Sequence, residues 1–313
     1  MDNICKHIVV AISLHGKSIT EPRLRFLYSG LVSSNFFGKE SKDYESVIKL
    51  LVGALLNRIV IDKDNMLYNL FNPSIADFVI SNYLVEFNYI DELLICLKTP
   101  ESISNINSLK ESGVVGKDFF INILESQLIR LSKLNDGNDI DSYKLRILSL
   151  GSSILSPQGI VLEYIQCLVK SALSSGPCSY GIDYFEFVNW AHSLGLIDTN
   201  DVVFKKQLEC WVCEYEKDMD EFIPISKLVS AVDINPSTLT ENLKKQYIEH
   251  LSEWITRDVI EEGILSDVYD ADTCTYSDIS DYVKKRFSEL VIPFEEADVD
   301  AVCESCDFDD IVQ

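Results

Sequence analysis

Apolar side chains recur every three to four residues along most of this chain, and that spacing predicts amphipathic helices. Beyond residue 90, helix follows helix with short joints and almost no strand pattern. The predicted helices cover 116–134, 140–155, 181–194, 199–217, 221–232, 238–267 and 275–290, and Ser156 and Pro157 open one more. Breaks at 174–177 and 235–237 separate neighbouring helices. Because no repeat of fixed period is present, we predict an α-helical array over residues 91–290 without naming a repeat family.

The first 90 residues follow a different pattern. Helical stretches at about 3–14, 20–33 and 43–57 are followed by β-branched or apolar strands at 58–61 and 66–71. The polar turn at 62–65 joins the two strands into a short β-hairpin. Three helices and a two-stranded wing are typical of a winged-helix domain. The predicted fold class is therefore mainly α, with a winged-helix-like domain over residues 1–90 and the helical array after it.

Charge is distributed unevenly between these two parts. The chain has 313 residues, with 27 Lys and Arg against 50 Asp and Glu, a formal net charge of −23. Residues 1–90 hold nine basic and nine acidic residues, so the whole acidic excess lies in residues 91–313. This break is consistent with a domain boundary near residue 90. The last segment, 291–313, holds eight acids and no base, which predicts a mobile tail or a docking peptide.

Composition also excludes several classes of protein. A strongly acidic chain repels the phosphate backbone, so we expect no nucleic-acid partner. The sequence has no run of about 18 uncharged apolar residues, so we expect no membrane-spanning segment. Its N-terminus lacks the features of a signal peptide. With 47% apolar and 25% charged residues, the composition predicts a soluble, cytoplasmic globular protein.

Nine cysteines at irregular spacing are expected to be reduced thiols. Two pairs have the CxxC spacing of zinc ligands: Cys210 with Cys213, and Cys303 with Cys306. The first pair lies within a predicted helix, where Trp211 is suited to packing. The second lies in the acidic segment, where carboxylates disfavour the thiolate that a metal requires. We therefore expect no metal and no cofactor.

A short motif follows the hairpin. Its residues are Asn72, Pro73, Ser74, Ile75, Asp77 and Phe78. Read from local chemistry alone, Asn72 caps a helix, Pro73 occupies its first turn, and Ser74 and Asp77 complete the polar first turns. Ile75 and Phe78 lie on the apolar face of that helix.

These residues, in this place after a wing, resemble a segment of the bacterial "novel STAND" group of P-loop ATPases. The resemblance implies that residues 1–90 correspond to the winged helix of such a protein and that the helices beyond correspond to its sensor region. The ATPase module that precedes the winged helix in that group has no counterpart in this sequence. Many relatives use a histidine in this segment to sense nucleotide phosphates. The matching residue here is Phe71, which cannot donate a hydrogen bond, so we expect no nucleotide contact from it.

A P-loop-like stretch near the N-terminus offers an alternative function. Gly16, Lys17 and Ser18 end a relaxed match to the phosphate-binding loop of ATPases. A P-loop joins a strand to a helix, and here the first glycine of the motif is replaced by Ala11. No run of parallel βα units follows to build the sheet that such a loop needs. ATP binding at this stretch is therefore the weaker interpretation.

The leading functional hypothesis is a non-catalytic interaction or sensor module, because no paired carboxylates or nucleophile motif can be assigned. From the family resemblance, we expect a protein partner, either an ATPase subunit or a trigger protein, in bacterial signalling or antiviral defence. The second hypothesis is a winged-helix transcription regulator that reads DNA through helix 43–57. That helix opens with acids and has only Lys49 and Arg58 as nearby bases, too few to anchor a phosphate backbone. An acidic inhibitor that mimics nucleic acid is a further alternative, which rests on charge alone.

Overall fold

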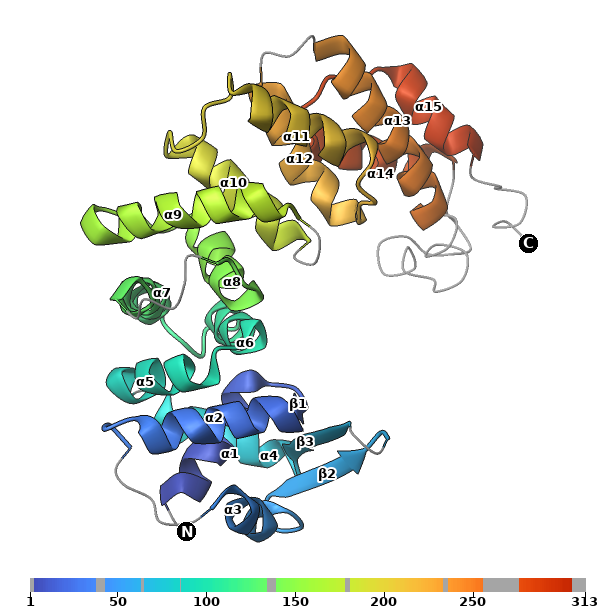
Figure 1. The fold of residues 1–313 in the computed structure, drawn as a ribbon. Helices are drawn as coiled ribbons and strands as arrows, with labels where there is room; N and C mark the ends of the chain where they lie inside the picture. The colour runs from blue at the N-terminus through green and yellow to red at the C-terminus, as the bar shows by residue number, and fades with distance from the viewer. Residues whose placement is uncertain are drawn as a thin grey trace. The chain divides into compact units, whose positions relative to one another are not determined.

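A computed structural model describes residues 3–37, 43–62, 65–84, 86–133, 139–177, 181–232, 236–255 and 276–305. Within this described part the fold is mainly helical, with 15 α-helices and a small antiparallel sheet of three strands near the N-terminus (Figure 1). The chain groups by contacts into two compact units, Met1–Leu168 and Val169–Gln313. The predicted fold class, mainly α with an N-terminal winged-helix-like domain, is confirmed.

The first unit begins with the elements of the winged-helix-like domain. They are α1 (Asn3–His15), β1 (Ile19–Thr20), α2 (Glu21–Ser33), α3 (Tyr44–Leu51), β2 (Leu56–Val60), β3 (Met66–Leu70) and α4 (Pro73–Tyr83). Helix α1 is buried along almost its whole length, because all but two of its residues are shielded from solvent. The domain is therefore built around α1, with α2, α3, α4 and β3 packed against it.

The sheet has the strand order β1-β3-β2, so the predicted hairpin is present and its second strand lies in the middle. Strand β1 pairs with β3 through Ile19 and Tyr68 and was not predicted, because two residues are too few to show an alternating pattern. The prediction of a third helix reaching residue 57 is wrong. Helix α3 ends at Leu51, and Gly53 adopts a positive φ of 81° in the turn that leads into β2.

The helical array starts within the same unit. Its helices there are α5 (Phe87–Leu97), α6 (Pro100–Glu111), α7 (Lys117–Lys133), α8 (Ser142–Gly151) and α9 (Gly159–Ser175), whose last turns belong to the second unit. Helix α5 packs on α2 and α7, and α6 packs on α1 and α8 (Figure 1). The winged-helix-like elements and the first array helices thus share one core across the predicted boundary near residue 90. Helix α9 begins at Gly159, two residues beyond the predicted opening at Ser156 and Pro157.

The second unit is helical throughout its described part. Its elements are α10 (Ile182–Ser193), α11 (Val202–Cys213), a short 3₁₀ turn (Met219–Glu221), α12 (Phe222–Ala231), α13 (Pro236–Trp254), α14 (Tyr276–Glu289) and α15 (Glu296–Ser305). Aromatic rings fill its core in edge-to-face pairs, such as Tyr184 on Trp211 and Tyr247 on Phe287. Helix α13 begins at Pro236, within the predicted break at 235–237 and two residues before the predicted helix 238–267, and residues 256–267 of that helix lie outside the described residues.

The acidic C-terminal segment differs from the prediction of a mobile tail or docking peptide. Residues 296–305 form α15, which packs on α13 and α14 and buries Val299, Val302 and Cys303. Lys244 on α13 lies 3.1 Å from Asp298, which places a cation against the acidic helix. The expectation fails for this part because charge counting ignored three apolar residues at helical spacing. Residues 306–313 of the predicted tail lie outside the described residues.

Lys98 ends α5 in a left-handed conformation, with φ 43° and ψ 52°. It is the only described non-glycine residue with a positive φ. A side chain costs roughly 1 kcal/mol there, while glycine is relaxed. We expect Lys98→Gly to raise the free energy of unfolding by about 1 kcal/mol in urea titrations, and Lys98→Ala to leave it near the wild-type value. A Lys98→Gly variant that is no more stable than Lys98→Ala would contradict this strain.

Candidate functional site

The predicted motif forms the start of α4. Asn72 is the N-cap, and its side-chain oxygen accepts a hydrogen bond from the Ser74 N–H at 3.0 Å. Pro73 occupies the first helical position, where its missing N–H and fixed φ suit a helix start. The local reading of the motif as a helix start is confirmed. Asp77 is exposed and does not line the cavities described below.

A largely apolar cavity of about 340 Å³ lies between α1 and α4. It is lined by Lys6, Val9, Val10, Leu55, Ser74, Ile75, Phe78, Val79 and Tyr83. The sequence predicted the contribution of α4 but not the wall that α1 supplies. Val9 and Val10 follow the helical spacing of a core helix, and only the packing of α4 on α1 shows that they also border a cavity. The one formal charge of the lining is the Lys6 ammonium, 4.3 Å from the centre of the Tyr83 ring.

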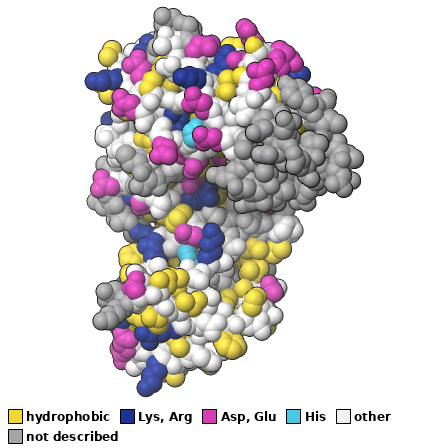
Figure 2. Space-filling view, turned by 90° about the vertical axis from the view of Figure 1, so that its right-hand side faces the viewer, with side chains coloured by type: hydrophobic (Ala, Val, Ile, Leu, Met, Phe, Trp, Pro, Cys, Tyr) yellow, Lys and Arg dark blue, Asp and Glu magenta, His cyan; other side chains and the backbone are white. Residues whose placement is uncertain are grey.

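Two phenyl rings near the start of α4 are exposed: Phe78 lines this cavity, whereas Phe71 precedes the N-cap and is not part of the lining. Phe78 is 62% exposed and Phe71 is 58% exposed, although both are large and apolar. Of the α4 residues only Val79 is buried, so most of this helix lies at the surface. Figure 2, which faces the wing, shows hydrophobic side chains gathered at the surface over the N-terminal elements. An apolar surface around a formed cavity is a feature of protein-binding sites.

A second cavity, of about 310 Å³, lies where the end of α1 meets β3 and the start of α4. It brings the P-loop-like residues Gly16, Lys17 and Ser18 next to Pro73 of the motif. The geometry of a P-loop is nevertheless contradicted. Residues 11–15, which a P-loop would place at a strand end, are the last turn of α1, and a two-residue antiparallel strand follows Ser18.

The end of α1 is closed by the protein itself. Asn105 on α6 donates from its amide to the carbonyls of Ser13 and Leu14, at 3.2 and 3.0 Å. Gly16 turns the chain with a φ of 74°, and a Cβ there would lie 2.9 Å from the Asn105 side chain. Gly16 is therefore explained by a helix end and a close approach, and a phosphate nest is not needed to account for it.

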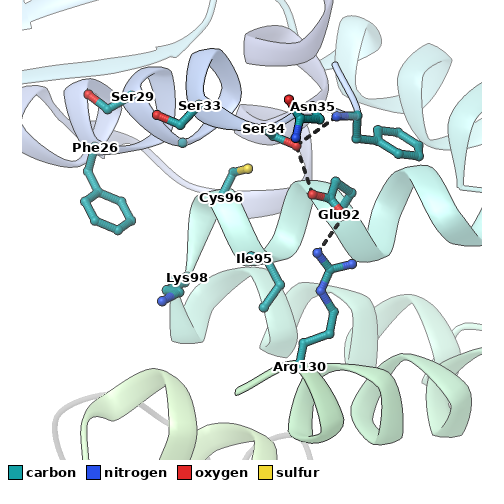
Figure 3. Close-up of a pocket in the computed structure, with 12 residues that line it drawn as sticks. Phe26, Ser29, Ser33, Ser34, Asn35, Glu92, Ile95, Cys96, Lys98 and Arg130 are labelled. Carbon is teal, nitrogen blue, oxygen red and sulfur yellow. Dashed lines mark hydrogen bonds and ion pairs between the residues drawn. The ribbon is translucent and has the colours of Figure 1, made fainter. Parts of the chain in front are cut away.

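The largest of these cavities, about 570 Å³, lies between the end of α2 and helices α5 and α7 (Figure 3). Glu92 crosses it, accepting a hydrogen bond from the Ser34 hydroxyl at 2.9 Å and pairing with Arg130 at 2.6 Å. The Cys96 thiol also borders this cavity, and burial raises its pKa to about 12. A thiol with such a pKa is not ionised near neutrality, so Cys96 is unsuited to nucleophilic catalysis.

Three comparisons with known proteins identify no family and no relative for this chain. No family model, no curated protein and no solved structure matches this chain. The family resemblance of the motif therefore rests on the residues themselves.

The candidate zinc ligands are only partly described. Cys210 and Cys213 are both exposed on α11, Cys303 is buried on α15, and Cys306 lies outside the described residues. Across the described ranges, no group of three or more His, Cys, Asp or Glu side chains is arranged to hold a metal ion. In the same ranges, no helix is both long and apolar enough to cross a membrane.

Helix α3 is the part of the predicted recognition helix 43–57 that is helical in the structure. Besides Lys49 and Arg58, the helix is close to Arg25 of α2, which is paired with Glu21 at 2.8 Å and with Glu45 on α3 itself. Leu50, which is exposed, adds an apolar side chain to the same helix. Phosphate binding requires cations that are not already neutralised, so this arrangement does not favour DNA.

Proposed function

We propose that this protein is a non-catalytic interaction module, similar to the winged helix and sensor region of a STAND ATPase, which binds a protein partner. The observation that carries the proposal is the surface of α1 and α4, where an apolar cavity is lined in part by the exposed Phe78. An exposed aromatic ring beside an apolar cavity is typical of protein interfaces. The motif that resembles the family starts the same helix, so one element carries both lines of support.

In this scheme the winged-helix-like domain couples partner binding to an ATPase, and the helical array supplies further binding surface. A partner can shift the protein between two conformational states only if it binds one state more tightly than the other. The shared core of α1, α2, α5 and α6 supports such coupling within the first unit, because the first two array helices pack directly on the wing-bearing elements.

The proposal predicts that Phe78→Ser strongly reduces capture of the partner. Affinity purification of the tagged full chain from cells that carry the neighbouring genes should retain an ATPase or trigger protein. Loss of one exposed aromatic anchor is expected to weaken binding by about 2 kcal/mol, or some thirtyfold.

Phe26→Ser is the matched control, because Phe26 is also an exposed phenylalanine of the first unit but lies beside the cavity of Glu92 and Arg130. The control should capture the partner as the wild type does. Equal capture by wild type and Phe78→Ser, or capture of no protein by the wild type, would contradict the proposed function.

A further inference from the structure

Strand β2 is an open edge of the three-stranded sheet. Among the described residues, the strand order β1-β3-β2 leaves the side of β2 that faces away from β3 without a partner strand, apart from a bridge between Leu56 and Val52 at its start. Figure 1 shows the far end of β2 projecting away from the helices of the first unit. An edge strand presents N–H and C=O groups that can pair with another chain.

The hydrogen bonds to β3 show which groups are open. The Phe71 N–H donates to the Leu55 carbonyl at 2.8 Å, and the Ile61 N–H donates to the Asn65 carbonyl at 3.0 Å. Along an antiparallel pair of strands, residue pairs that exchange backbone hydrogen bonds alternate with pairs that do not. The odd-numbered residues of β2 therefore bond to β3. The N–H and C=O of Arg58 and Val60 therefore point away from β3.

The side chains along this edge are apolar where edges of soluble proteins are usually charged. Ile59 is 43% exposed, Val60 62% and Ile61 63%, although all three are β-branched and suited to a strand. Arg58 precedes this run and Asp62 follows it. Natural edges are commonly protected by lysine, proline or a bulge, and the run 59–61 contains none of these.

Residues 58–62 have charges that are complementary to those of a second copy of the same segment placed antiparallel to it. Arg-Ile-Val-Ile-Asp, read against a second copy in the antiparallel direction, places Val60 opposite Val60 of the second copy and Ile59 opposite Ile61. Each Arg58 then lies opposite an Asp62, which is the favourable arrangement of charges across an antiparallel pair. A register shifted so that Arg58 faces Arg58 would place like charges directly opposite, so charge selects the first register.

We propose that two copies of this chain associate through their β2 edges, antiparallel and centred on Val60, which joins the two sheets into one of six strands. The open N–H and C=O of Val60 exchange a reciprocal pair of hydrogen bonds with the second copy across a two-fold axis. The contact lies on the wing, so this inference does not depend on the partner proposed for α1 and α4.

The test is the mass of the full chain in solution, measured by sedimentation equilibrium over a series of concentrations. The wild type should rise from 35.5 kDa toward twice that mass. Arg58→Glu and Asp62→Lys each place like charges opposite one another at two positions, and each should weaken dimerisation by about tenfold. The double variant restores opposite charges in the same register and should return the dissociation constant to near the wild-type value.

Asn65→Ala is the matched control for the turn. Asp62 accepts hydrogen bonds from Asn65, from its N–H at 2.9 Å and its amide at 2.6 Å, so Asp62→Lys also disturbs the hairpin. Asn65→Ala removes the side-chain contact without changing a charge and should dimerise as the wild type does. A wild type that stays at 35.5 kDa throughout, or a double variant no tighter than the single ones, would overturn the proposal.

Discussion

Asp91→Ala is expected to destabilise the first unit by about 3 kcal/mol, one of the two largest effects that we predict. Asp91 is buried on α5 and joins that helix to α7. Its carboxylate accepts hydrogen bonds from the Ser126 hydroxyl at 2.8 Å, the Gln127 amide at 2.6 Å and Arg130 at 3.1 Å. Gln127 in turn accepts a hydrogen bond from the buried Tyr143 hydroxyl at 2.7 Å. Removing the carboxylate leaves the buried Gln127 amide and the half-buried Ser126 and Arg130 without this acceptor, which costs more than the lost contacts alone.

Chemical denaturation of the full chain, followed by far-UV circular dichroism, measures this effect. Glu92→Ala is the control, since Glu92 also pairs with Arg130 but borders an open cavity instead of the buried network. We expect it to cost about 1 kcal/mol. Equal losses in the two variants would show that the buried network contributes no more than the more accessible ion pair.

Acidification is expected to destabilise the fold through His7. His7 is buried on α1, its Nδ1 lies 2.8 Å from the Tyr89 hydroxyl, and its ring packs against Phe37. Burial, with a smaller contribution from the Lys6 ammonium, lowers the pKa of His7 from 6.5 to about 4. Between these two values the unfolded chain binds a proton that the folded chain does not, so stability falls as the pH drops below 6.5. At pH 5 the loss relative to pH 7 should be about 2 kcal/mol.

His7→Gln isolates this contribution, because glutamine keeps a polar group near Tyr89 but does not titrate. The free energies of unfolding of wild type and variant, measured at several pH values from 7 to 5, should converge as the pH falls. All other titrating groups are shared by the two proteins and cancel in the difference. A difference that stays constant with pH would mean that His7 is protonated equally in the folded and unfolded chains.

The sequence predicted the helical elements well where packing and periodicity agree. Pro73 starts a helix where expected, because proline fixes φ and needs no hydrogen-bond acceptor in a first turn. Pro236 also starts a helix, although the sequence predicted a break at 235–237. The failures come from tertiary context. Strand β1 exists only because β3 offers it a partner, and α15 forms where apolar residues are spaced for a helix within an acidic segment.

The candidate site was predicted in part. Local chemistry identified Asn72 and Pro73 as a helix start, and the structure shows this directly. The cavity could not be predicted, because Val9 and Val10 are distant in sequence from Phe78 and meet it only through the packing of α1 on α4. Exposure also cannot be read from residue type, since an amphipathic pattern places Phe78 in a core as readily as at an interface.

The central claim is that the surface of α1 and α4 binds a protein partner. Hydrogen exchange of the full chain, measured by mass spectrometry with and without the captured partner, tests it most directly. The account predicts slower exchange of the backbone amides of α4 and of the α1 residues that line the cavity, while α11 exchanges as before. Unchanged exchange in α4, with protection confined to the second unit, would contradict it.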